Sequence, residues 1–119
     1  PAMRMTDEEY FRSCVAKERQ LAHLLGHRQI EECYESAGTL WEGRTKLPQW
    51  CRQWSACGPL LIAHRIPLQF GSDAAGAWVQ AGSTTQHLAD HPTPDRAVMV
   101  AVVKEVVRRL EHPKELRAA

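Results

Sequence analysis

Four histidines and two cysteines have spacings that could bind a metal ion. They are His23, His27, His87, His91, Cys51 and Cys57. The histidines form two pairs with a separation of four residues, which places both members of a pair on one face of a helix. However, the cysteine spacing does not match a zinc finger or ribbon, and neither pair contains the glutamate of an HExxH motif. We therefore predict no metal site and no cofactor, with a metal-dependent hydrolase that uses His87 and His91 as the alternative.

Cys57 is the residue best placed to serve as a nucleophile, because it lies near the expected start of a helix, where the pKa of a thiol falls. The nearest histidine, His64, follows about two helical turns later, so the two side chains cannot touch on one helix. The chain also has no GxSxG, Walker or GxGxxG motif. The sequence therefore predicts a buried cysteine, no catalytic residues and a protein that is not an enzyme.

Four tryptophans are many for a chain of 119 residues. Trp41 and Trp78 fall in apolar segments, which predicts core positions for them. Trp50 and Trp54 lie one helical turn apart, on either side of Arg52, in a connector bounded by proline. Since tryptophan and arginine dominate the binding energy of protein interfaces, we predict that Trp50, Arg52 and Trp54 form a partner-binding surface.

The charges of the chain are balanced in number and unevenly distributed. The formal net charge is +1, so no overall field attracts nucleic acid or an anionic membrane. Residues 48–94 contain only Arg52, Arg65, Asp73 and Asp90 as charged side chains, which predicts buried strands, a partner surface or both.

No apolar run approaches the roughly 18 residues of a membrane-spanning helix, and the acidic start does not resemble a signal peptide. We expect a cytoplasmic protein whose four cysteines are reduced.

Residues 93–111 predict a long helix around which the rest of the chain is organised. Thr93 can cap this helix, Pro94 suits its first position and Pro113 ends it. Seven apolar residues share one broad face: Met99, Val100, Val102, Val103, Val106, Val107 and Leu110. This face spans roughly 160°, which is wider than a single packing contact needs. Part of it is expected to pack on the first helix.

A second copy could cover the remainder of that face, and Met99, Val103 and Val107 are the predicted dimer residues. The opposite face carries Lys104, Glu105, Arg108, Arg109 and Glu111. We expect this charged face to be solvated, because its basic and acidic residues are interleaved. Nucleic-acid binding by the basic residues is the alternative.

Two further helices and two hairpins complete the prediction. Thr6 and Glu9 form a capping box that begins a helix over residues 6–26, and Ser55 caps a helix over residues 56–65 with Pro59 in its first turn. Strands are expected at residues 29–35 and 39–44, where a helix at 29–36 is the alternative, and at residues 66–70 and 77–81. Residues 82–91 are expected to be a loop.

The chain is therefore predicted to be a single α+β domain over residues 1–119. About four short strands form one antiparallel sheet, packed with three helices in the order α-β-β-α-β-β-α. We expect residues 1–5 to be disordered remnants of expression and residues 114–119 to be a frayed tail.

Several short segments follow one another between residues 15 and 110. They are Leu24-Leu25-Gly26, Gly38-Thr39-Leu40-Trp41, Trp54-Ser55 with Gly58-Pro59-Leu60-Leu61, Ile66-Pro67-Leu68 before Trp78, and Pro92-Thr93-Pro94 before an Ala/Val-rich helix. In this order they resemble small phage and prophage proteins of the NinX-like, or "ABA sandwich", kind. The Asp-rich start of the second helix in those proteins is replaced here by Ala56-Cys57-Gly58.

The resemblance implies a phage or prophage gene more than a reaction, because such families largely lack an assigned activity. Small phage proteins of this sort often bind a host or phage macromolecule. We therefore expect an accessory protein of the bacterial cytoplasm that binds a host or phage protein, as an antagonist or adaptor of host machinery. Inhibition of a bacterial defence system is one form of this hypothesis.

Overall fold

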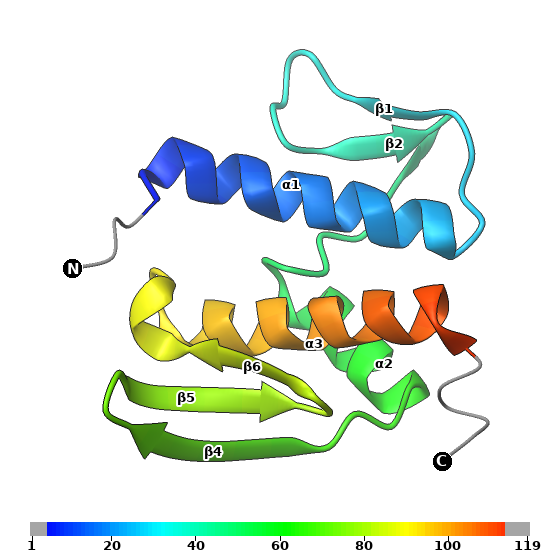
Figure 1. Cartoon of the computed structure of the whole chain (residues 1–119). Coiled ribbons are helices and arrows are strands. Elements are labelled where there is room, and N and C mark those ends of the chain that lie inside the picture. The colour runs from blue at the N-terminus through cyan, green and yellow to red at the C-terminus, as the bar shows by residue number, and fades with distance from the viewer. Residues whose placement is uncertain (1–4, 114–119) are drawn as a thin grey trace.

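The structure, a computed structural model, describes residues 5–113 (Figure 1). The expectations for residues 1–4 and 114–119 lie outside this range. In chain order the elements are α1 (Asp7–Leu24), β1 (Ile30–Glu32), β2 (Leu40–Glu42), β3 (Thr45–Lys46), α2 (Trp54–Ala63), β4 (Leu68–Asp73), β5 (Gly76–Ala81), β6 (Thr84–His87), the short 3₁₀ helix η1 (Leu88–Asp90) and α3 (Pro94–Glu111). Within the described residues, no helix is both long enough and apolar enough to cross a membrane.

The α+β class is confirmed, but the arrangement of the strands differs from the prediction. The described residues form two separate antiparallel sheets of three strands each, instead of one sheet of about four. Sheet A has the order β1-β2-β3, and sheet B has the order β4-β5-β6. Residues 5–113 contain three α-helices, as the sequence predicts.

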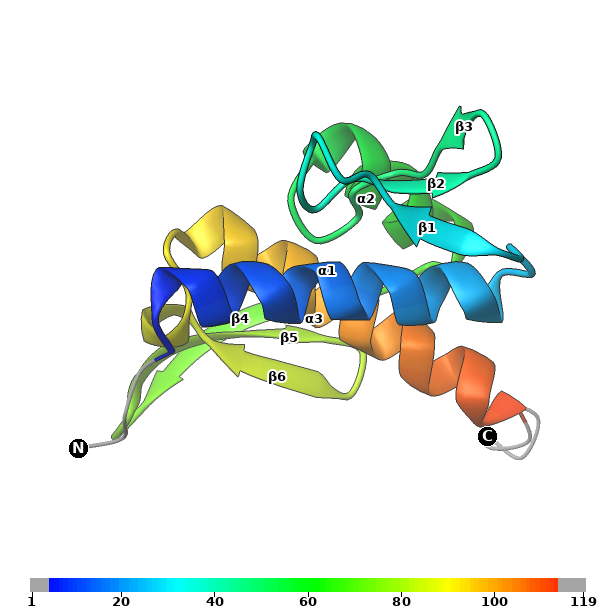
Figure 2. The same cartoon turned by 90° about the horizontal axis from the view of Figure 1, so that it is seen from above.

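Helix α3 lies at the centre of the molecule. It packs between α1 on one side and sheet B on the other, with α2 beside it (Figures 1 and 2). Residues 97–103 are all buried without interruption, so every side of two helical turns is covered. Thr93 accepts a hydrogen bond from Arg96 N at 3.2 Å, and Pro94 occupies the first turn, as predicted.

The predicted dimer residues lie inside this core. Met99, Val103 and Val107 are 2 %, 0 % and 8 % exposed, because α1, α2 and sheet B surround the helix. These side chains are therefore not available to a second copy, and this part of the sequence prediction is corrected. The other helices and sheet B of the same chain cover the wide apolar face of α3.

Helix α1 begins at the predicted capping box. Glu9 N donates to Thr6 Oγ1 at 3.1 Å, and Thr6 N donates to the Glu9 carboxylate at 2.9 Å. After the helix ends at Leu24, Gly26 adopts a φ of +99°, which favours glycine. The helix runs in the same direction as α3, since the Tyr10 hydroxyl contacts His91 near one end of the pair and Gln20 bonds Glu111 near the other.

Sheet A forms from the first predicted hairpin. Strands β1 and β2 pair from Ile30↔Glu42 to Glu32↔Leu40, so the alternative of a helix at 29–36 is wrong. A third strand, β3, was not predicted, because its ladder contains only two residues opposite β2. Ile30 and Leu40 are the buried residues of this sheet's strands.

Sheet B contains the second predicted hairpin and one further strand. The predicted strand at 77–81 is confirmed, whereas the strand predicted at 66–70 begins at Leu68 and continues to Asp73. Residues 84–87 form strand β6, although they were expected in a loop. Val79 and Ala81 of β5 are fully buried and face α3, and Trp78 lies on the opposite face of the sheet, against Gly71.

Candidate functional site

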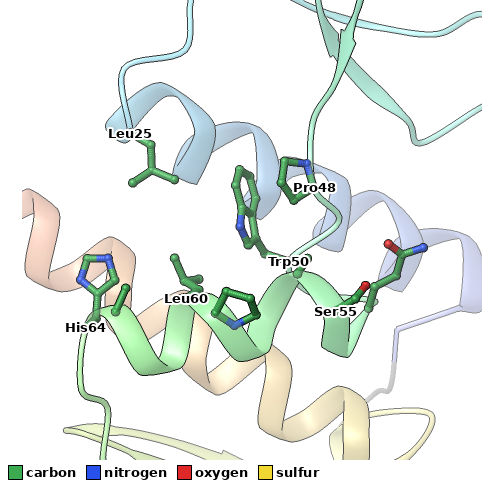
Figure 3. Close-up of a pocket in the computed structure, with 10 residues that line it drawn as sticks. Leu25, Pro48, Trp50, Ser55, Leu60 and His64 are labelled. Carbon is green, nitrogen blue, oxygen red and sulfur yellow. The ribbon is translucent and has the colours of Figure 1, made fainter.

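A groove of about 550 Å³ runs along α2 and is the candidate binding site (Figure 3). Ten residues from α2, the connector before it and the end of α1 line this groove: Leu25, Pro48, Trp50, Gln53, Ser55, Ala56, Pro59, Leu60, Ala63 and His64. The Trp50 indole lies between Pro48 and Leu60, with Leu25 and His64 at one end of the groove and Ser55 at the other. Hereafter these residues are called the α2 groove.

Helix α2 has a sequence that does not favour a helix by itself. It begins at Trp54, two residues before the predicted start, and its N-cap residue Gln53 makes no side-chain capping bond. Pro59 is therefore in the helix interior and not in the first turn, and with Gly58 it costs roughly 4 kcal/mol relative to alanine. Burial of Cys57 and Leu60 in the core compensates for this cost.

The outer side of α2 is apolar and exposed. Ile62 is 71 % exposed and Trp54 is 43 % exposed, and Leu25 at the end of α1 is 40 % exposed. The helix contains no charged residue along its whole length. Its outer side therefore differs from an ordinary surface helix, which carries charged residues opposite its apolar stripe.

The side chains of the α2 groove suit apolar recognition and do not suit proton transfer. None of the ten lining residues is an aspartate, glutamate, lysine or arginine. Ser55 and His64 are nine residues apart and lie about 13 Å from each other along the helix, so they cannot share a proton. The Cys57 thiol is buried against Met99 O, and burial raises its pKa to about 12. This thiol is therefore not a reactive thiolate.

The structure separates the three residues predicted to form one partner surface. Trp50 is 6 % exposed and forms the floor of the α2 groove. Trp54 is exposed at the start of α2, and its indole Nε1 donates to Asp95 at 3.1 Å. Arg52 points to neither of them, since its guanidinium contacts Glu18. Of these three residues, Trp54 is therefore the one with an exposed side chain.

Arg52 joins three segments of the chain. Its guanidinium bonds both oxygens of the Glu18 carboxylate in α1 and donates to Gly38 O at 2.7 Å. Cys51 N adds a third donor to Glu18 at 3.0 Å. Because Glu18 is only 1 % exposed, its charge is compensated by Arg52 and not by water. Arg52 is therefore a structural residue.

The two histidine pairs do not converge. His87 Nε2 lies 3.0 Å from the Asp73 carboxylate on sheet B, whereas His91 Nδ1 contacts the Tyr10 hydroxyl. His27 Nδ1 lies 2.9 Å from the Glu42 carboxylate. Among residues 5–113, no three histidine, cysteine or acidic side chains are grouped as metal ligands.

A polar cluster between α1 and α3 was not predicted from the sequence. The Arg96 guanidinium lies 5.3 Å from the Tyr10 ring and donates to Cys14 Sγ at 3.5 Å. A hydrogen bond with Cys51, with further support from Arg96, lowers the pKa of the Cys14 thiol to about 6 in spite of its burial. Both thiols are fully buried, so the cluster offers no access to a substrate. No sequence motif links these residues, which come from distant segments.

The expected solvated face of α3 is partly buried. Glu105 is 0 % exposed and accepts hydrogen bonds from Arg108 Nη2 at 2.9 Å and Arg109 Nε at 2.8 Å. Ser83 and Thr84, at the turn between β5 and β6, donate to the same carboxylate. These two arginines therefore hold Glu105 in place, which weakens the alternative of a phosphate-binding face.

Comparisons of the chain with protein families, with curated proteins and with solved structures gave no significant match.

Proposed function

We propose that this chain is a small phage or prophage accessory protein that binds a host or phage protein through the α2 groove and has no catalytic role. The observation that carries the proposal is the uncharged helix α2, whose apolar outer side is exposed beside a groove of about 550 Å³. Exposed apolar side chains that are grouped beside a groove are typical of interaction sites. The residue order that resembles NinX-like proteins supports the phage setting.

The chemistry of the groove favours one kind of partner, an amphipathic helix with an apolar face. Such a helix binds by placing side chains from successive turns into an apolar groove. No lining residue carries a formal charge that could pair with an acidic or basic group on the partner. Ser55 and His64 supply polar groups at the two ends of the groove, where they could fix the register of the partner (Figure 3).

The partner is best sought by affinity capture from a bacterial lysate followed by mass spectrometry. The test variant is Leu25→Lys, which places a charge in the lining of the α2 groove at a side chain that is 40 % exposed and outside the core. The control variant is Tyr34→Lys, since Tyr34 is 100 % exposed in the loop between β1 and β2. Both variants change an exposed apolar side chain into a lysine, so they differ only in position.

We expect one captured protein to be shared by the wild type and Tyr34→Lys and to be lost with Leu25→Lys. Its affinity, measured by calorimetry with purified components, should fall at least tenfold in Leu25→Lys, because apolar residues inside an interface typically contribute more than about 1 kcal/mol to binding. Equal capture by both variants would place the binding surface elsewhere and overturn the assignment of the α2 groove.

A further inference from the structure

The outermost strand of sheet B has a free edge. Among the strands of residues 5–113, β5 alone pairs with β4 in the order β4-β5-β6, and the other side of β4 is open (Figure 1). The residues of an antiparallel strand direct their backbone groups alternately to the two sides. Gly82 N donates to Pro67 O at 2.9 Å, and the same register continues through Gln69↔Gln80 and Gly71↔Trp78. These residues therefore bond inward to β5.

The intervening residues direct their backbone groups away from β5. Leu68, Phe70 and Ser72 each present one N–H and one C=O group along the free edge, and none of the described residues lies in register to pair with them. The edge thus offers three donors and three acceptors in alternation. This is the pattern that a further antiparallel strand requires.

The edge also lacks the features that keep natural edge strands unpaired. Such edges are usually short, or carry lysine, proline or a bulge. Strand β4 is six residues long and contains no lysine, arginine or proline. Its one charged residue, Asp73, lies at the end of the strand, 3.0 Å from His87 Nε2. In the middle, Phe70 is 65 % exposed, which is costly for an isolated molecule.

We propose that a second copy of this chain pairs with β4 and forms a symmetric dimer. In this arrangement the two β4 strands are antiparallel, with Phe70 opposite the same residue of the other copy and Leu68 opposite Ser72. Each of these three opposing pairs exchanges two backbone hydrogen bonds, and the two sheets become one sheet of six strands. No charged residue faces a like charge, because Asp73 lies opposite Pro67.

The proposed register gives each side of β4 a distinct role. Phe70 shares a sheet face with Val79, so the two phenyl rings meet on the face that carries α3, with a Cα separation of about 5.5 Å. The side chain of Gln69 lies on the other face and opposes Gly71 of the second copy. A lysine at position 70 would therefore face the lysine of the other copy and prevent dimerisation. A lysine at position 69 would face Gly71 and leave the dimer intact.

Sedimentation velocity over a concentration series tests this geometry directly. We expect a concentration-dependent dimer for the wild type and for the control Gln69→Lys, and a monomer for Phe70→Lys. A mixture of Phe70→Lys and Phe70→Glu should form a dimer again, because opposite charges then face each other at the symmetry axis. Circular dichroism identifies any variant that fails to fold, and both variants at exposed Phe70 leave the core intact.

A wild-type protein that stays monomeric at its highest soluble concentration would overturn the proposal. So would a dimer that persists in Phe70→Lys, because the two copies would then associate through another surface. The Leu25→Lys variant keeps the β4 edge unchanged and should still form the dimer. Failure of this inference is therefore distinguishable from failure of the proposed α2 groove.

Discussion

Glu105 provides a quantitative test of how α3 and sheet B are held together. Its carboxylate is fully buried and accepts hydrogen bonds from Ser83, Thr84, Arg108 and Arg109. Burial alone would raise the pKa of this group, but the hydrogen bonds from the arginines and Thr84 lower it from 4.5 to about 2. Relative to the unfolded chain, the folded protein therefore stabilises the ionised form over the protonated form by up to about 3 kcal/mol.

We expect the substitution Glu105→Gln to remove up to about 3 kcal/mol of unfolding free energy at pH 7, because glutamine keeps the shape of the side chain and removes its charge. The folded pKa is depressed, so this stabilisation is complete above pH 4.5 and is lost as the pH falls towards 2. The difference in stability between the wild type and Glu105→Gln should therefore shrink over that interval.

Urea denaturation followed by tryptophan fluorescence, repeated between pH 7 and pH 3, measures this difference. The matched control is Glu111→Gln on the same helix, since Glu111 is exposed and its carboxylate accepts a surface hydrogen bond from the Gln20 amide. The control should change stability by no more than about 0.5 kcal/mol. A Glu105→Gln effect below about 1 kcal/mol, or one that does not vary with pH, would refute the assigned role of this carboxylate.

Four further substitutions test the packing by the same denaturation assay. Trp50→Ala should lower the free energy of unfolding by about 3–5 kcal/mol, because it empties the floor of the α2 groove. Trp54→Ala should lower it by about 1 kcal/mol or less, because this side chain is exposed. Equal losses would contradict the different burial of the two residues. Arg52→Ala should cost about 3–5 kcal/mol because it leaves the carboxylate of Glu18 buried without its cation, and a near-neutral result would contradict this. Gly71→Ala should cost about 1–3 kcal/mol and change the near-ultraviolet circular dichroism, since its Cβ would lie 2.3 Å from the indole of β5; an unchanged spectrum would contradict that contact.

The helices could be predicted because their signals are local. The capping box of α1 and the Thr93-Pro94 start of α3 lie within four residues of the groups that they satisfy, and both are present. Strand β6 was missed because residues 84–87 are polar and show no apolar alternation; pairing with β5 alone makes them a strand. The predicted start of α2 is too late in the chain, because proline is expected in the first turn of a helix. Here Pro59 lies in the interior of a helix that begins at Trp54.

The site residues were harder to predict because their environment depends on distant segments. The sequence predicts that Arg52 contacts a partner, but its guanidinium binds the carboxylate of Glu18, which lies 34 residues earlier in α1. Glu105 was assigned to the solvent face by helical periodicity, and its burial follows from donors about 21 residues earlier in the chain. Trp54 was identified correctly as exposed, whereas the α2 groove beside it requires Leu25, which no local pattern connects to α2.

The attachment of sheet A to the rest of the molecule has a consequence for the order in which the chain opens. Arginines make much of this attachment: Arg12 bonds Glu32 at 2.8 Å, Arg19 bonds Ile30 O at 3.0 Å, and Arg52 bonds Gly38 O. Salt screens the partly exposed Arg12–Glu32 ion pair, whereas it does not weaken the apolar packing around α3. The amide protons of sheet A should therefore exchange with deuterium by partial opening, well before those of α3, which require global unfolding.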